Sequence, residues 1–168
     1  PNVEAIVARF VELLALVPAD GHIVLANNEK HLHDARTRAS IKAKVTTYGA
    51  GADIESAEVS EDERGLSFTV IVKDCGVSEG GGRCFLPLSG QHNVDNALGA
   101  YAILAGLGLS HDEIAKGFAS FAGVKRRMEV RGEADGCIVV DDFAHHPTAV
   151  QTTLMGARQR YKTRPLWG

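Results

Sequence analysis

The hydrophobic positions of the chain follow a helical period at its start and form short apolar runs further on. Between residues 3 and 17 apolar side chains recur every three or four positions, which predicts a helix with one broad buried face. Apolar runs at 22–26 and 44–49 flank a helical stretch at 29–39. Strand, helix and strand in this order predict a parallel crossover.

The middle of the chain is rich in β-branched and aromatic residues. Three segments there predict strands, at 52–59, 66–72 and 83–88. Two apolar helical patterns follow at 91–107 and 110–121, and the serine that opens the second is its expected N-cap. The alternation of strands and helices predicts an α/β fold.

Composition changes near Gly123, where we expect a domain boundary. The later segments predict two strands, a helix and the start of a further strand, at 128–131, 137–140, 147–161 and from Pro165 onward. We therefore divide the chain into 1–123 and 124–168. The chain begins at Pro1 and ends inside an apolar element, so we expect it to be a piece of a longer protein.

Composition and charge exclude several classes of protein. The 168 residues are 45% hydrophobic and 23% charged, which is enough to bury a core. A net charge of −3 argues against nucleic acid or a lipid surface as the main partner. No apolar run approaches the roughly 20 residues of a membrane-spanning helix, and no signal peptide opens the chain. These features favour a cytoplasmic location.

Three cysteines, Cys75, Cys84 and Cys137, show neither the number nor the spacing of a disulfide framework or a zinc site. We expect them to be reduced and buried, and we predict no metal site from the sequence.

The first motif that carries candidate chemistry is G-Q-H-N-V-D-N-A at 90–97, between a strand and an apolar helix. Asn93 and Asn96 are three residues apart, so they share one face of the first helical turn. A carboxamide offers both a donor and an acceptor, which matches the N6/N7 edge of adenine. The alternative is that these polar residues only cap the helix.

The second motif is K-R-R-M-E at 125–129. If this segment is a strand, Arg126 and Arg127 point to opposite faces, so only one of them enters a given cleft. The planar guanidinium of arginine suits a phosphate group. The alternative is a solvated basic turn.

The third motif is V-D-D-F-A-H-H-P-T at 140–148, where a predicted strand ends just before a helix. Ligands of open α/β sheets bind at this edge. Its carboxylates and imidazoles could transfer protons, hold a metal or accept ribose hydroxyls. Alternatively, Asp141 or Asp142 caps the turn, and His146 takes the N-cap position before Pro147.

In this order, the three motifs resemble those of the Mur ligase family, the ATP-dependent ligases of peptidoglycan precursors. The resemblance implies that residues 1–123 are the C-terminal portion of the central ATP-binding domain. Residues 124–168 would then begin the Rossmann-like C-terminal domain. It also implies nucleotide-binding and catalytic roles: Asn93 and Asn96 face adenine, Arg127 reaches the phosphates, Asp142 binds ribose, and His92 and His145 line the interdomain cleft.

The implied reaction uses ATP and Mg²⁺ to convert a muramic acid carboxylate to an acyl phosphate, which an amine then attacks. The residues of the second and third motifs most resemble those of one branch of the family. That branch joins UDP-N-acetylmuramate to the murein tripeptide L-alanyl-γ-D-glutamyl-meso-diaminopimelate in peptidoglycan recycling. The branch that adds L-alanine is the alternative, although it usually has tyrosine where this chain has Phe143.

The chain departs from the family pattern in one respect, because it contains no G-x-x-x-x-G-K-[ST] phosphate loop. We therefore expect the chain alone to be inactive as a ligase and to bind ATP weakly at most. A different class of function, a non-catalytic interaction module with the same ancestry, stays open.

Overall fold

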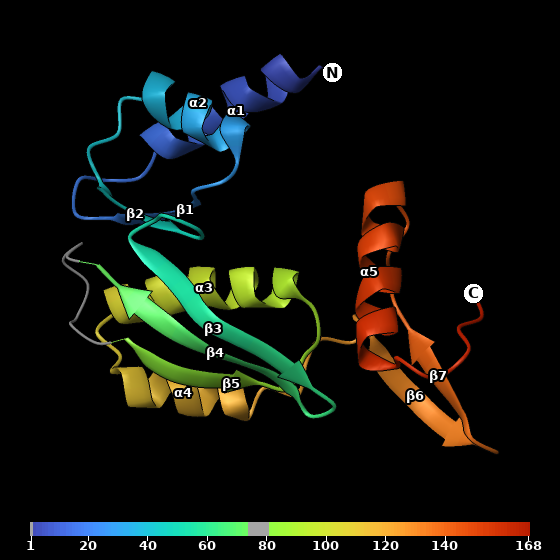
Figure 1. The fold of residues 1–168 in the computed structure, drawn as a ribbon. Coiled ribbons are helices and arrows are strands. Elements are labelled where there is room, and N and C mark those ends of the chain that lie inside the picture. Colours follow the sequence, from blue (N-terminus) through green and yellow to red (C-terminus); the bar gives the residue numbers. More distant parts are fainter. Residues whose placement is uncertain (1, 74–80) are drawn as a thin grey trace.

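The computed structural model describes residues 2–73 and 81–168, which form a five-stranded and a two-stranded sheet with helices (Figure 1). The predicted α/β class is confirmed. Helix α1 (Val3–Ala15) is capped by Asn2, whose side chain accepts a hydrogen bond from the Ala5 amide at 2.9 Å.

The first strands form the predicted parallel crossover. Strands β1 (His22–Ala26) and β2 (Lys44–Tyr48) pair in parallel, and α2 (Lys30–Arg38) connects them. Helices α1 and α2 lie together on one side of this pair, with α3 (Gln91–Gly106) on the other (Figure 1). A small apolar cluster joins the first layer to the strands: Val7, Leu14, Ile23, Ala35 and Ala43.

The sheet becomes antiparallel after β2. Strand β3 (Ile54–Asp62) meets β2 in parallel, and β4 (Gly65–Val72) and β5 (Gly82–Leu86) then pair antiparallel in turn. The strand order is β1-β2-β3-β4-β5. The sheet is therefore mixed, with a crossover half and a meander half.

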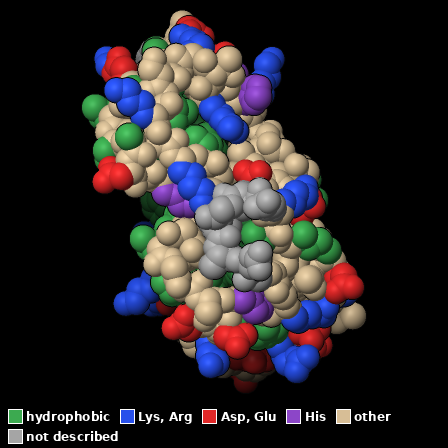
Figure 2. All heavy atoms as spheres, turned by 90° about the vertical axis from the view of Figure 1, so that its left-hand side faces the viewer, with side chains coloured by type: hydrophobic (Ala, Val, Ile, Leu, Met, Phe, Trp, Pro, Cys, Tyr) green, Lys and Arg blue, Asp and Glu red, His purple; other side chains and the backbone are tan. Residues whose placement is uncertain are grey.

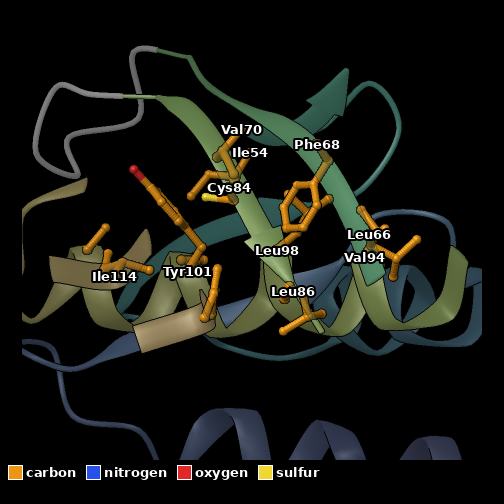
Figure 3. Packing of buried hydrophobic residues seen from close by; sticks show 14 residues of the cluster. Ile54, Leu66, Phe68, Val70, Cys84, Leu86, Val94, Leu98, Tyr101 and Ile114 are labelled. Atoms are coloured by element: carbon orange, nitrogen blue, oxygen red, sulfur yellow. The ribbon is translucent and has the colours of Figure 1, made fainter. Parts of the chain in front are cut away.

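Helices α3 and α4 (His111–Ala119) share the main core with the sheet (Figure 3). Ser110 caps α4: its hydroxyl accepts from the Glu113 amide at 3.4 Å, and the Glu113 carboxylate accepts from the Ser110 amide at 2.9 Å. The predicted N-cap is confirmed as a reciprocal capping box. The core residues are Ile54, Leu66, Phe68, Val70, Cys84, Leu86, Val94, Ala97, Leu98, Tyr101, Ala102, Ala105, Ile114 and Phe118.

The C-terminal part of the chain is a hairpin and one helix. Strands β6 (Glu129–Ala134) and β7 (Cys137–Asp141) pair antiparallel, and α5 (Pro147–Arg160) follows. The strand expected from Pro165 is absent, because residues 165–168 have no regular structure. Pro165 has no amide hydrogen to donate to a sheet, and glycine at position 168 weakens a strand further.

Several surface features bear on the excluded functions. On the described part of the face in Figure 2, acidic and basic side chains are interspersed and do not form one basic field. Within residues 2–73 and 81–168, no helix has the length and hydropathy needed to cross a membrane.

Cys84 is buried, which raises the pKa of its thiol to about 11. Cys137 is exposed, so the expectation of burial is wrong for it, and Cys75 lies outside the described residues.

Candidate functional site

The first motif lies where β5 turns into α3. Gly90 is the N-cap residue and has φ of +89°, a conformation that L side chains rarely adopt. The ring of His92 lies against it, because a Cβ at position 90 would come within 2.8 Å of the imidazole Cε1. The sharp turn at Gly90 therefore places the His92 side chain over the start of the helix.

The two asparagines of this motif keep hydrogen-bonding capacity. The Asn93 Nδ2 donates to the Ser89 carbonyl at 2.7 Å. One Asn93 N–H and its Oδ1 then remain, which is the pair of groups that an adenine edge requires. Asn96 is exposed and has no hydrogen-bond partner among the described residues. Neither side chain accepts from a helix N–H, so this geometry does not support the capping alternative.

Glu61, at the end of β3, is a neighbour of this motif that sequence analysis did not identify. Its Oε2 accepts from the Gly90 amide at 3.4 Å. Its Oε1 is buried and has no partner among the described residues. No local signal could have indicated Glu61, because it reaches the motif through pairing of distant strands.

The second and third motifs meet at the base of the β6–β7 hairpin. The Met128 amide donates to Asp142 Oδ2 at 2.8 Å, and the Phe143 amide donates to the Arg126 carbonyl at 2.8 Å. Arg126 and Arg127 are in a turn that precedes β6, so the expectation that they alternate along a strand is wrong. The physical reason is left-handed backbone at Arg126 (φ of +59°) and at Met128 (φ of +50°), which breaks the extended conformation.

Asp142 connects three parts of this region. Besides Met128, its carboxylate accepts from the Ala144 amide at 2.8 Å and from the Thr153 hydroxyl of α5 at 3.1 Å. The turn-capping alternative thus describes part of what Asp142 does. A carboxylate has about four acceptor positions, so one remains for a ligand hydroxyl.

The two arginines differ in what surrounds them. The Arg127 guanidinium is exposed and has no partner in the described part of the chain, so it is available to a phosphate. Arg126 is held instead: its amide donates to Glu129 Oε2 at 2.8 Å, and its side chain lies 3.9 Å from Asp141. The Arg126 amide is the main reason that the pKa of Glu129 is lowered, with Arg131 adding to it.

The two histidines of the third motif lie just before α5. His146 is the N-cap residue by position, but its side chain makes no capping hydrogen bond. His145 Nδ1 lies 2.9 Å from the Phe143 carbonyl oxygen, and the two imidazole centroids are 4.2 Å apart. The motif therefore presents two imidazoles in contact, with their planes tilted by 44°, at the end of the strand.

The residues present fit a nucleotide better than a metal. Asn93, Asn96, Arg127 and Asp142 retain the donors and acceptors that adenine, phosphate and ribose require. Among residues 2–73 and 81–168, no group of three or more His, Cys, Asp or Glu side chains is placed to hold a metal ion. The Mg²⁺ that the resemblance implies would need fewer protein ligands than such a group, because Mg²⁺ keeps several waters and binds substrate phosphates.

The six predicted residues form two groups. Among the described residues, no hydrogen bond or ion pair joins His92, Asn93 and Asn96 to the C-terminal group. An open hollow of about 840 Å³ separates the β3–β4 turn from β6 and the end of α5, but none of the predicted site residues lines it. The structure thus brings the second and third motifs together and leaves the first on its own helix.

Comparison with protein families gives two consecutive matches. Residues 1–104 match the Mur ligase middle domain, and residues 126–168 match the Mur ligase glutamate ligase domain. Among curated proteins, the UDP-N-acetylmuramate–L-alanine ligase of Rhodospirillum centenum is 36% identical over 154 residues, covering 89% of this chain and 31% of that protein. The corresponding ligase of Trichlorobacter lovleyi is 36% identical over 98% of this chain and 35% of its own length.

Similar solved structures come from several branches of the family, including the murein peptide ligases. A murein peptide ligase from Psychrobacter arcticus is 32% identical with a TM-score of 0.73, covering 98% of this chain and 34% of that one. The UDP-N-acetylmuramate:L-alanyl-γ-D-glutamyl-meso-diaminopimelate ligase from Neisseria meningitides is 26% identical with a TM-score of 0.61, covering 75% and 36%. The chain spans about a third of the length of these relatives.

Proposed function

The chain belongs to the Mur ligase family, and from that membership we propose that it is part of an ATP-dependent ligase that forms an amide bond on a peptidoglycan precursor. The observation that carries the proposal is the pair of family matches, which follow each other in the order of the motifs. We place the domain boundary at Gly123, between the two matched regions. The cytoplasmic location stays a prediction.

In this proposal the chain supplies the groups that hold the nucleotide. Asn93 and Asn96 face the adenine from α3, because they retain a free donor and acceptor on one helical face. Asp142 accepts a ribose hydroxyl with its remaining oxygen position, and Arg127 neutralises phosphate charge. His92 and His145 line the reaction cleft. We assign these roles by resemblance and by the unused hydrogen-bonding capacity of each group.

The proposed reaction proceeds through an acyl phosphate on the muramic acid carboxylate. The free amine then attacks the acyl carbon and forms the C–N bond, the C–O bond to the phosphate breaks, and inorganic phosphate leaves as the amine nitrogen loses a proton. Nothing in this chain needs to react covalently, so its contribution is to position the nucleotide and balance its charge. When bound elsewhere in the full ligase, Mg²⁺ would supply further charge neutralisation.

Two incoming groups are candidates. The residues of the motifs, including Phe143, favour the tripeptide, and so does the 32% identity to a murein peptide ligase. L-Alanine is favoured by the curated relatives, which are about as similar to this chain at 36% identity. We therefore propose the ligase class and keep both amines as substrates to be tested.

A chimeric enzyme tests the proposal directly. Residues 1–168 replace the matching third of the Rhodospirillum centenum ligase, and phosphate release is followed with UDP-N-acetylmuramate, ATP and either amine. We expect amide formation by the chimera and none by the isolated chain. Asn96→Ala in the chimera should raise the KM for ATP by about tenfold, in line with loss of one base-edge contact. Asn28→Ala, an exposed asparagine on a loop, serves as the matched control.

Three outcomes would contradict the proposal. A folded chimera that releases no phosphate with either amine would exclude the ligase role of this segment. Equal KM values for the Asn96 and Asn28 variants would exclude the adenine contact. Micromolar ATP binding by the isolated 168-residue chain would overturn the expectation that the chain needs the missing phosphate loop.

A further inference from the structure

The side chains of Arg126, Phe143, His145 and His146 contact one another in turn and form a column beside Asp142. The Arg126 guanidinium carbon lies 4.8 Å from the centroid of the Phe143 ring. The Phe143 ring meets His145 edge to face, with centroids 4.9 Å apart and planes at 60°. His145 in turn lies 4.2 Å from His146. A cation over a ring face and an edge-to-face ring pair are both attractive arrangements.

The column is anchored at the Arg126 end by backbone groups. The Arg126 carbonyl accepts from the Phe143 amide at 2.8 Å, and the Arg126 amide donates to Glu129 at 2.8 Å. The guanidinium also lies 3.9 Å from Asp141. These contacts hold Arg126 in its left-handed conformation, so the guanidinium and the Phe143 ring keep a set relation to each other.

The geometry also determines which nitrogen of His145 carries the proton. Its Nδ1 lies 2.9 Å from the Phe143 carbonyl oxygen. A carbonyl oxygen can only accept a hydrogen bond, so Nδ1 must be the donor. In the neutral imidazole Nε2 then keeps its lone pair and is the acceptor, since the partner of one ring nitrogen sets the state of the other.

We propose that Arg126 and Phe143 are positioning residues that hold His145 in the Nδ1–H form and present Nε2 to a ligand as a hydrogen-bond acceptor. Such a nitrogen takes a donor group and rejects a bare phosphate oxygen. The identity of the donor rests on the proposed function, in which the incoming amine is a group of this kind. The tautomer and its dependence on Arg126 and Phe143 do not rest on that function.

Nitrogen NMR of the isolated 168-residue chain with labelled histidine tests the proposal at about pH 8, where an ordinary imidazole is neutral. A His145→Gln variant identifies the His145 signals. We expect Nδ1 to resonate as a protonated nitrogen and Nε2, far downfield, as an unprotonated one. Neither ATP nor an active enzyme is needed, so this result stands apart from the chimera assay.

Variants then distinguish a role of Arg126 and Phe143 in positioning His145 from a role in folding alone. Arg126→Asn keeps a residue that tolerates the left-handed backbone but removes the guanidinium. Phe143→Leu keeps an apolar side chain but removes the ring. Each should shift the Nε2 signal upfield as Nε2–H forms become populated, whereas Arg126→Lys and Phe143→Tyr should largely retain the native signals.

Val139→Ala is the control, because Val139 is 60% exposed on the same hairpin and takes no part in the column. Backbone amide spectra show whether each variant remains folded. A native His145 with its proton on Nε2 would overturn the proposal. So would an unchanged Nδ1–H form in folded Arg126→Asn and Phe143→Leu chains, because the positioning role would then be absent.

Discussion

The sheet with its helices and the hairpin with α5 hold their candidate site residues by different means. The first motif begins α3, a helix that contributes Val94, Leu98 and Tyr101 to a core of fully buried side chains. In the second region, no hydrophobic side chain after Phe118 is buried, although every residue there is described. Its site residues are placed by hydrogen bonds to Asp142 and by edge-to-face and tilted ring contacts.

This difference predicts different responses to substitution. Packing is collective, so a destabilising change in the core should unfold the whole first region. Asn93 and Asn96 would then lose their positions together with the rest of α3. A hydrogen-bonded turn can open locally, so a change there should release the site residues while the rest of the chain stays folded. The following substitutions test that contrast, beginning with the largest expected effect.

The same substitution in both regions gives the strongest contrast. Phe68→Ala removes a fully buried ring and should lower the free energy of unfolding by about 3–5 kcal/mol. Phe143→Ala removes a ring that is 48% exposed and should change it far less. Urea unfolding followed by circular dichroism measures both. Equal losses would mean that the two regions share one core.

A substitution at the turn before α3 tests how rigidly the first motif is held. Gly90→Ala places a methyl group against the His92 ring at a φ of +89°. We expect a loss of about 1–3 kcal/mol from the strained backbone, measured by urea unfolding. Gly117→Ala is the control, since a Cβ there meets no atom within 4 Å. If the two variants are equally stable, the turn is not constrained in the way described.

Asp142→Asn tests the hydrogen-bonded region. The carboxamide can accept with only one of its two terminal atoms, so the Met128 or Ala144 amide loses its acceptor, at a local loss of about 1–3 kcal/mol. Hydrogen exchange of these two amides should accelerate while the core amides stay protected. Asp141→Asn, which loses only a 3.9 Å ion pair, should leave them slow. Uniform acceleration across both regions would contradict local opening.

The smallest effect is expected at the exposed cap of α4. Ser110→Ala should remove about 1 kcal/mol of stability at neutral pH. The Ser110 hydroxyl, and then its amide, lower the pKa of Glu113. Because the folded pKa is depressed, the stabilisation is present above the ordinary value of about 4.3 and is lost as pH falls through the folded value. The midpoints of urea unfolding at neutral and at acidic pH measure this loss of stability.

Glu113→Gln is the matched variant for the pH measurement, because it keeps the side-chain shape without the charge. Its unfolding midpoint should fall less on acidification than that of the native chain. An identical acid response in both would show that other carboxylates dominate the pH dependence.

Periodicity predicted the elements well where burial enforces it. The crossover strands, α3 and α4 occupy nearly the expected ranges, because apolar spacing and caps such as Ser110 act locally. The pattern failed at 126–128, where left-handed backbone at Arg126 and Met128 forms a turn, and the strand expected from 128 begins only at Glu129. No propensity predicts a positive φ at arginine, since tertiary contacts impose it.

The chemistry of the candidate site was predictable only in part. Residue type and spacing indicated Asn93 and Asn96, since both lie on one helical face. The approach of Glu61 and the stacking of Arg126 on Phe143 depend on strands and turns that meet across long stretches of sequence. Which oxygen of Asp142 stays available likewise follows only from its three partners.

The left-handed backbone at Arg126 has a consequence for how this position can vary over evolution. A branched or long side chain there carries a conformational penalty of about 1–2 kcal/mol that glycine avoids and asparagine reduces. Selection for stability alone would therefore move the position toward those residues. Where arginine at 126 and an aromatic ring at 143 are kept together, ligand binding and not stability would account for the pair. Where one of the two residues has been replaced, we expect the other position to vary freely.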